Sequence, residues 1–218
     1  MKSSMLRALL MGSLLCAIPA AAQQIYNNGP INGTTDAWTI NFGFIVTDTF
    51  TVSTPNATVG SLAFGAWLFP GDVLESVDVA VTSEAFGGTT YFNGVVSFTQ
   101  SGCSGNQYGF NVCTETGFFN GPNLAAGTYW LELQNAIVND GDPIYWDENS
   151  GVGCTSPGCP SIAEGNNCIL NGVECIPSES FTLSSAGTST VPEPSSFLLF
   201  GSGFFGVVSI LRRRMRSA

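Results

Sequence analysis

The sequence contains no histidine, and its lysines and arginines are confined to the two ends of the chain. Between Gln23 and Val191 there is no cationic side chain at all. This lack excludes serine–histidine and cysteine–histidine nucleophile pairs, Schiff-base lysines, arginine clamps for phosphoryl transfer and histidine-based metal sites in that segment. What remains for acid–base chemistry there is carboxylates.

Positive charge is missing from a segment that is rich in negative charge. The chain has 16 Asp and Glu residues, and all except Glu193 lie between Gln23 and Val191. An acidic surface repels the phosphates of nucleic acids and anionic membranes. We therefore expect no nucleic-acid partner, and we interpret most of these acids as solvated residues that keep an exported domain soluble.

One kind of site that carboxylates support is a glycan-cleaving centre, in which two of them flank a sugar bond. The candidate acids are Glu115, Glu132, Asp147 and Glu148. Nothing marks them apart from their charge, so we interpret them as solvated surface acids. We assign no catalytic residue and predict a protein that is not an enzyme.

The other kind of site is a metal centre. Asp140, Asp142 and Asp147 stand in one short acidic stretch, and calcium takes about six to eight oxygen ligands. The spacing is not that of an EF-hand loop. A calcium site and a plain acidic turn both remain open, and no other cofactor is expected.

Long apolar runs are also scarce, and the first of them lies at the N-terminal end. Lys2 and Arg7 accompany the apolar run Ala8–Ile18, and Pro19 and small residues up to Ala22 follow it. This order is typical of a secretory signal peptide. We predict a signal helix in residues 1–22, cleavage after Ala22 and therefore export.

Export agrees with the cysteine content. Outside the signal segment an even number of cysteines remains, and disulfides form in oxidising compartments. Their spacing does not match a zinc site. The sequence leaves the pairing open, and the first guess joins neighbours along the chain, namely Cys103–Cys113, Cys154–Cys159 and Cys168–Cys175.

The second apolar run lies at the C-terminal end. It follows the motif Pro192-Glu193-Pro194 and precedes a cluster of arginines, which are Arg212, Arg213, Arg214 and Arg216. As a helix, residues 195–211 come close to spanning the ~30 Å hydrocarbon core of a bilayer. Arginines stay on the cytoplasmic side, so we predict a transmembrane helix at 195–211 with the body of the protein outside.

This three-part tail resembles the PEP-CTERM sorting signal of exported bacterial proteins. The resemblance is confined to residues 191–218, with the Pro192-Glu193-Pro194 motif, the glycine-rich apolar run and the terminal arginines. It implies an exosortase-type membrane protease as partner, an intermediate anchored in the inner membrane, and release to the cell surface or the outside. Cargo of such systems is often associated with exopolysaccharide and biofilm, whereas the cargo domains themselves differ widely.

The segment 23–183 shows the period-two alternation of β-strands. Turn signals separate the runs, and no long stretch has a helical period. We predict an all-β fold, a secreted, jelly-roll-like β-sandwich. Strands are expected around residues 38–44, 50–52, 62–68, 77–81, 91–98, 108–113, 129–133 and 181–183.

Two segments are expected to lack strands. Residues 151–177 are rich in Gly, Pro, Asn and Cys, and we interpret them as a long loop held by disulfides. Residues 184–190 form a Ser/Thr/Gly linker before the sorting tail.

Aromatic side chains offer flat faces on which sugar rings stack, although in a β-sandwich they more often belong to the core. The candidates are Trp38, Trp67, Trp130, Trp146, Tyr91, Tyr108 and Tyr145. The sequence thus favours a non-catalytic binding or matrix protein associated with exopolysaccharide. The alternatives are a carboxylate-based glycan-cleaving enzyme and a purely structural surface protein.

Overall fold

Side chains that alternate between the interior and the surface give the chain its strands. In β5 (Leu74–Glu84), Val77, Val79 and Val81 are fully buried, whereas Asp78 between them is partly exposed. Branched side chains of this kind favour extended backbone. The computed structural model describes residues 22–149, 161–164, 175–176 and 178–186. These residues contain strands and no helix, which confirms the all-β class.

The strands differ widely in length. In chain order they are β1 (Gln24–Asn27), β2 (Ala37–Thr39), β3 (Ile45–Val52), β4 (Ala57–Leu68), β5 (Leu74–Glu84), β6 (Gly87–Gly105), β7 (Asn111–Phe118), β8 (Asn123–Leu124), β9 (Gly127–Val138), β10 (Tyr145–Asp147), β11 (Ser161–Glu164), β12 (Cys175–Ile176) and β13 (Phe181–Ser185).

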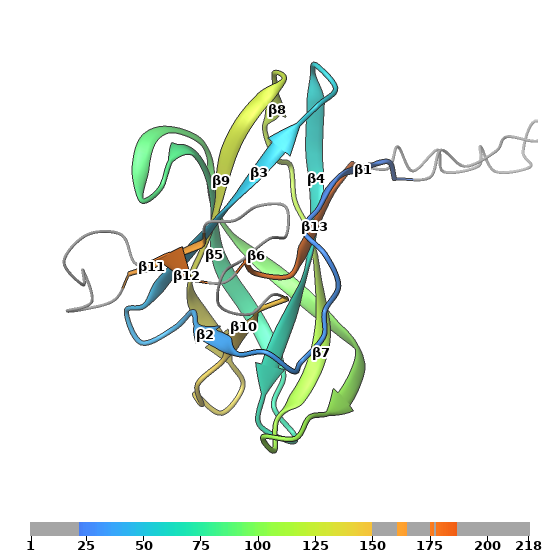
Figure 1. Cartoon of the computed structure of the whole chain (residues 1–218), viewed down its shortest axis with the longest axis vertical. Coiled ribbons are helices and arrows are strands. Elements are labelled where there is room, and N and C mark those ends of the chain that lie inside the picture. Colours follow the sequence, from blue (N-terminus) through green and yellow to red (C-terminus); the bar gives the residue numbers. More distant parts are fainter. Residues whose placement is uncertain (1–21, 150–160, 165–174, 177, 187–218) are drawn as a thin grey trace, which may run out of the picture. The chain divides into compact units, whose positions relative to one another are not determined.

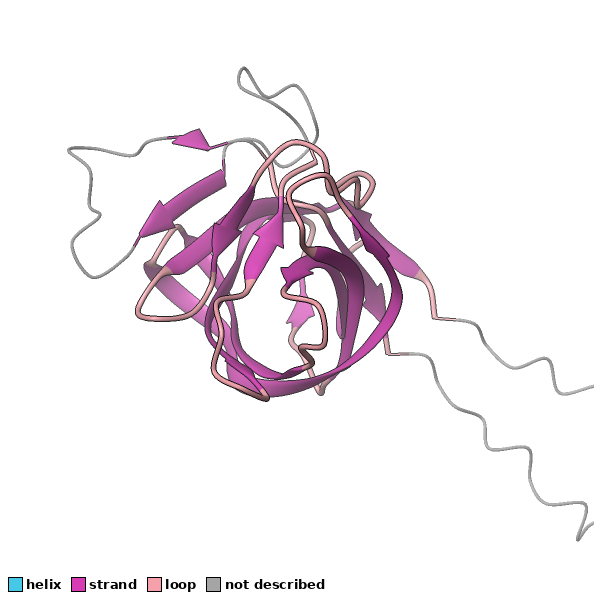
Figure 2. Ribbon diagram, turned by 90° about the horizontal axis from the view of Figure 1, so that it is seen from below, coloured by secondary structure: helices cyan, strands magenta, loops and turns pink. Residues whose placement is uncertain are grey.

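The strands form one sheet that curls back on itself. Hydrogen-bonded neighbours follow the order β1-β13-β4-β7-β6-β5-β9-β3-β11-β12 (Figure 1). Strands β2, β8 and β10 attach to the side of this path through β4 and β10. The view along the sheet shows the strands arranged in a nearly closed, barrel-like ring (Figure 2).

A sandwich of two separate sheets was predicted, and the observed sheet differs because of one long strand. β6 has 19 residues. Its first part pairs with β5 from Ser76 to Glu84, and its last part pairs with β7. The partner changes between Ser97 and Phe98, and a register shift between Ser101 and Ser104 follows within the part that pairs with β7. One strand therefore belongs to both sides of the core and joins them.

The ring is completed by side chains where β1 and β3 approach each other. Asp48 of β3 is fully buried. One of its carboxylate oxygens accepts hydrogen bonds from the Asn28 side-chain amide (2.9 Å), the Ser178 hydroxyl (3.0 Å) and the Glu179 backbone N–H (2.8 Å). Residues that follow β1 and precede β13 are thus tied to β3 without a strand ladder.

The interior of the ring is a continuous apolar core. Leu131 and Leu133 of β9 lie opposite Val81 and Val79 of β5, and all four side chains are fully buried. The largest fully buried side chains come from strands around the ring and from two residues that adjoin strands, Ile40 and Ile144. They are Trp146, Phe50, Phe64, Phe181, Ile40, Leu62, Leu68, Leu74, Leu124, Leu131, Leu133 and Ile144.

Three expectations about strands were wrong. The linker predicted at 184–190 begins inside a strand, since Ser184 and Ser185 belong to β13. The strand predicted at 38–44 ends at Thr39, because Phe42 and Gly43 have positive φ angles of 57° and 85° and the Phe44 N–H donates to the Asn41 carbonyl (3.1 Å). This turn separates β2 from β3. The loop predicted at 151–177 contains β11, which pairs antiparallel with β3.

The targeting segments fall largely outside the described residues. This applies to the predicted signal helix apart from Ala22, to the predicted transmembrane helix at 195–211, and to the sorting motif. Within the described ranges, no helix has the length and apolarity needed to cross a bilayer.

Candidate functional site

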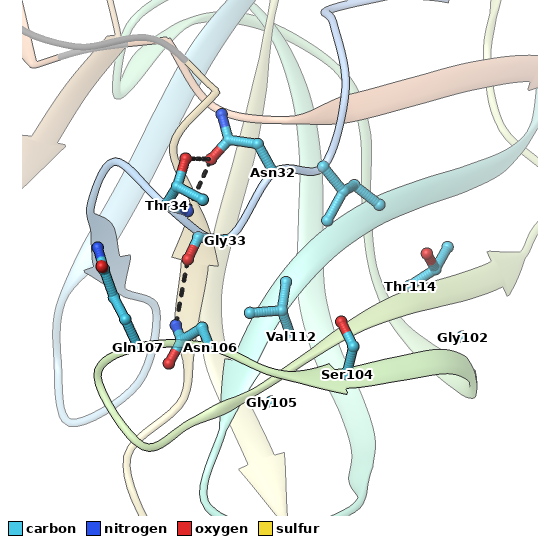
Figure 3. A pocket seen from close by; sticks show the side chains of 11 residues that line it. Asn32, Gly33, Thr34, Gly102, Ser104, Gly105, Asn106, Gln107, Val112 and Thr114 are labelled. Atoms are coloured by element: carbon cyan, nitrogen blue, oxygen red, sulfur yellow. Dashed lines mark hydrogen bonds between the residues drawn. The ribbon is translucent and has the colours of Figure 1, made fainter.

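A polar pocket lies where the loop after β1 meets the β6–β7 hairpin (Figure 3). Its walls are the loop residues 31–34, the end of β6 with the turn that follows it (residues 102–107), and the start of β7. Asn32 and Thr34 lie toward one end, and Ser104 and Thr114 toward the other. The volume of the pocket is about 380 Å³.

Asn106 fixes the two walls relative to each other. Its side-chain amide donates to the Gly33 carbonyl oxygen (3.3 Å), and its side-chain oxygen accepts from the backbone N–H groups of Tyr108 and Phe110 (3.0 Å each). This is a side-chain turn of the kind that asparagine favours. The pocket therefore has a preformed shape.

The pocket offers hydrogen-bonding groups without charge. Asn32, Thr34, Ser104, Gln107 and Thr114 line it, and among the residues that the structure describes no charged side chain does. The side-chain oxygen of Asn32 accepts from the backbone N–H and the hydroxyl of Thr34 (2.8 and 3.0 Å). Hydroxyl and amide groups of this kind bind the hydroxyls of a neutral, polar ligand.

Tyr108 supplies an aromatic face at the rim of the pocket. Its hydroxyl lies 3.5 Å from the Thr34 carbonyl oxygen, and its ring stacks on Trp67 with centroids 5.4 Å apart and an interplanar angle of 20°. The side chain is 53% exposed. Among the predicted sugar-stacking residues, Tyr108 is thus placed beside a pocket, whereas Trp67 and Trp146 are buried.

Asp147 supports the pocket from behind. Its carboxylate accepts hydrogen bonds from the backbone N–H groups of Asn32 (3.0 Å) and Gly33 (2.9 Å), from the Trp67 indole N–H (2.6 Å) and from the Ser180 hydroxyl (3.1 Å). Burial raises the pKa of Asp147, and these hydrogen bonds oppose the rise. The side chain positions both the loop and the Tyr108–Trp67 stack, which nothing in the sequence indicated.

The predicted calcium ligands are separated by the fold. Asp140 and Asp142 lie together in an exposed turn, but Asp147 does not belong to their cluster. Asp72, which comes from the turn between β4 and β5, takes that place. Sequence reasoning missed Asp72 because it is distant along the chain, although the adjoining Pro70-Gly71 correctly indicated a turn.

The acids weighed for glycan cleavage were interpreted as solvated, and this interpretation was wrong. Glu115, Glu132, Asp147 and Glu148 are all buried. Burial raises the pKa of Glu115 to about 7. The pKa of Glu148 rises to about 8 through burial and the nearby charges of Asp36 and Asp147. Glu115 shares one face of β7 with the buried Cys113, whereas Glu132 lies between the core residues Leu131 and Leu133 of β9 and therefore on the opposite face of that strand.

A disulfide holds the hairpin that carries the pocket. Cys103 of β6 is bonded to Cys113 of β7, as predicted. The Gln100 side-chain amide donates to the Cys113 sulfur (2.9 Å). Cys154, Cys159 and Cys168 lie outside the described residues, so the pairing of Cys175 stays a prediction.

Comparison with known proteins concerns the tail alone. Residues 190–214 match the family model of the PEP-CTERM protein-sorting motif, and the matched segment includes Pro192, Glu193 and Pro194. The predicted sorting signal is thereby confirmed. No curated protein matches the chain.

Proposed function

Because the chain carries a PEP-CTERM sorting motif at residues 190–214, we propose that it is an exported protein processed by an exosortase-type membrane protease and delivered to the cell surface or beyond. The apolar run after the motif and the arginines that follow it would hold the intermediate in the inner membrane with the β-domain outside. The disulfide between Cys103 and Cys113 supports an oxidising destination.

At that destination the domain binds a neutral saccharide of the extracellular polysaccharide. The observation that carries this proposal is the pocket of Figure 3, which uncharged amides and hydroxyls line. The exposed ring of Tyr108 lies next to it, with its hydroxyl 3.5 Å from the carbonyl oxygen of the lining residue Thr34. Its volume of about 380 Å³ lies within the range of roughly 300–1,000 Å³ that small-molecule sites occupy.

The charge of the domain limits the kind of saccharide. No lysine, arginine or histidine occurs between Gln23 and Val191, so an anionic sugar would meet only repulsion. An uncharged sugar needs no ionic partner, because amides and hydroxyls satisfy its hydroxyls and an aromatic face covers its C–H surface. The proposed ligand is therefore a neutral glycan.

The proposed binding is non-catalytic. Glycoside hydrolysis requires two carboxylic acids at the sugar bond, and none of the described residues that line the pocket is an acid. The candidate acids Glu115, Glu132 and Glu148 are buried, which supports binding without cleavage.

The pocket is tested with full-length protein that has been exported to an oxidising periplasm and purified in mild detergent. Its binding to the native exopolysaccharide is measured together with the release of soluble sugar. Tyr108→Ala should weaken binding by about fivefold, since a stacked aromatic contributes on the order of 1 kcal/mol. Gln107→Ala should weaken it as well.

The matched control is Tyr91→Ala, which removes a tyrosine that is 42% exposed at the other end of β6. It should bind as the unchanged protein does. Equal losses for Tyr91→Ala and Tyr108→Ala would place binding elsewhere. Absence of binding by the unchanged protein would favour a purely structural role, and released sugar would favour an enzyme.

The sorting step has its own test. Replacing Pro192, Glu193 and Pro194 by alanine should leave full-length protein in the inner membrane, because the protease loses its recognition motif. The product is followed by its size and by membrane fractionation. Trimmed, released protein from this variant would count against exosortase-type processing.

A further inference from the structure

Two turns at the same end of the ring bring together acids from distant parts of the chain. Asp72 stands in the turn between β4 and β5, where its N–H donates to the Phe69 carbonyl (3.1 Å). Asp140 and Asp142 follow β9, in a turn closed by the hydrogen bond from the Gly141 N–H to the Val138 carbonyl (3.1 Å). One carboxylate oxygen from each acid lies within 4.8 Å of the others.

Asn139 and Val73 hold the two turns against each other. The Val73 N–H donates to the Asn139 side-chain oxygen (2.9 Å), and the Asn139 N–H donates to the Val73 carbonyl (3.1 Å). The Asn41 side-chain amide also donates to the Asp142 carbonyl (3.0 Å). The acids are thus brought together by fixed backbone, and their proximity does not depend on the freedom of long side chains.

Asp72 is the decisive member of the cluster because one of its carboxylate oxygens is buried without a donor. Only 6% of its surface is exposed. Its Oδ2 atom is inaccessible and accepts no hydrogen bond from any described residue. A buried carboxylate oxygen in this state is costly unless a proton or a cation satisfies it. One carboxylate oxygen of Asp72 lies within 4.8 Å of a carboxylate oxygen from each of two further acids, Asp140 and Asp142, which are exposed.

No side chain of the domain can supply the missing positive charge. The nearest lysines and arginines in the sequence are Arg7 and Arg212, which belong to the two targeting ends. Three carboxylates at this separation repel one another. The domain therefore has no cationic side chain of its own to compensate this charge, and a proton or a cation from solution can do so.

We propose that Asp72, Asp140 and Asp142 bind a calcium ion that bridges the β4–β5 turn and the turn after β9. The donors are all oxygen atoms, which suit hard cations and not zinc or copper. Asp140 and Asp142 are exposed, so water can fill the remaining positions of a coordination shell of about six to eight oxygens. Magnesium demands a near-ideal octahedron and gives up its water reluctantly, so it fits these two separate turns less well.

Bound calcium would fasten one end of the ring. β5 begins at Leu74, directly after the Asp72 turn, and it pairs with β9, which ends at Val138 before Asp140. An ion held by both turns therefore locks the end of this strand pair. Binding to the folded state alone raises stability by mass action.

The test uses the full-length protein in mild detergent, freed of metal with a chelator that is then removed. Calcium binding is measured by titration calorimetry, and Tm is measured with and without 5 mM CaCl2 at matched ionic strength. We expect a dissociation constant of roughly 0.1–1 mM, as in extracellular calcium modules, and a rise in Tm of about 3–5 °C. Magnesium should produce a clearly smaller rise.

Three variants make the result specific. Asp72→Asn and Asp142→Asn each remove one charge while keeping the shape of the side chain, and each should weaken calcium binding by at least about tenfold and abolish the rise in Tm. Glu84→Gln removes the charge of an exposed acid at the other end of β5. This variant should leave calcium binding and the rise in Tm unchanged.

Several results would overturn the proposal. One is that the unchanged protein gives no heat of calcium binding. Another is that calcium raises the Tm of Asp142→Asn as much as it raises the Tm of the unchanged protein. A third is that magnesium, or sodium chloride alone, raises Tm as much as calcium does. Because Asp142 is exposed, this variant is expected to fold even if Asp72→Asn does not, and the site can still be judged from it.

Discussion

Gly33 shows how a single residue shapes the candidate pocket. Its φ is +64°, and a Cβ atom built on it would lie 2.6 Å from a methyl carbon of Val112. Its N–H donates to Asp147 and its carbonyl accepts from Asn106. The loop therefore passes the wall of the pocket at a distance that only glycine allows.

Gly33→Ala is expected to lower the free energy of unfolding by about 1–3 kcal/mol, because it combines a strained φ with a steric clash. Urea denaturation measures the loss. Gly105→Ala is the matched control, since Gly105 lines the same pocket and an added Cβ would meet nothing within 4 Å. Equal stability of the two variants would contradict the close approach to Val112.

Glu115 is a second residue with a large effect, because its burial makes the stability of the protein depend on pH. It is fully buried in β7, and neither carboxylate oxygen has a hydrogen-bond partner among the described residues. Burial raises its pKa from 4.5 to about 7. Protonation of Glu115 therefore stabilises the folded state fully below about pH 4.5, and this stabilisation is lost as the pH rises through about 7.

For Glu115→Gln we expect a weaker dependence of the unfolding free energy on pH. Glutamine does not ionise. The free energy of unfolding of the variant, relative to that of the unchanged protein, should therefore rise by roughly 3 kcal/mol between pH 4.5 and pH 8. Chemical denaturation across this range gives both curves. Parallel curves would show that Glu115 ionises normally in the folded protein.

At the scale of elements, the β6–β7 hairpin carries much of the candidate site. Its disulfide between Cys103 and Cys113 closes a loop with a sequence separation of 10, and the enclosed turn contains Asn106 and Tyr108. A cross-link of this kind limits the freedom of the unfolded chain.

Replacing Cys103 and Cys113 together by alanine should cost roughly 2–3 kcal/mol of stability, and it should also weaken binding of the polysaccharide by loosening the turn. Equilibrium unfolding and the binding assay measure the two effects. The unchanged protein treated with reductant is not an equivalent control, since the chain holds 7 cysteines. Unaltered stability of the double variant would show that the hairpin needs no cross-link.

At the scale of the whole molecule, buried acids accumulate in a domain whose described residues include no cationic side chain. The pKa of Glu179 lies well above its usual range through burial and the charges of Glu148, Asp48, Asp147 and Asp36. Raised values at Glu115 and Glu148 act in the same direction. Each of these acids favours the folded state while protonated and opposes it once ionised.

The protein should therefore be more stable at mildly acidic than at alkaline pH. We expect Tm to fall by on the order of 10 °C between pH 5.5 and pH 9, since several kcal/mol are lost and 1 kcal/mol corresponds to about 2–4 °C in a domain of this size. Calorimetry at both pH values, repeated in 0.5 M NaCl, checks this. Salt screens surface repulsion but not buried charge, so a fall in Tm that vanishes in salt would point to the surface acids instead.

The sequence by itself determined the features that are written locally. The sorting tail is a linear motif that needs no partner segment, and period-two alternation in runs such as Val77–Val81 is enough to predict strands. The Cys103–Cys113 pair was predictable because its partners flank a single turn.

Only the tertiary structure decided which distant residues meet and which side chains face inward. It placed Asp72 beside Asp140 and Asp142, turned Asp147 toward the pocket loop, and buried Glu115 in β7. It also joined the two sides of the core through β6, where a single sheet replaced the predicted sandwich. These outcomes depend on strand order and register, which are set by packing between segments far apart in the chain and leave no local pattern to read.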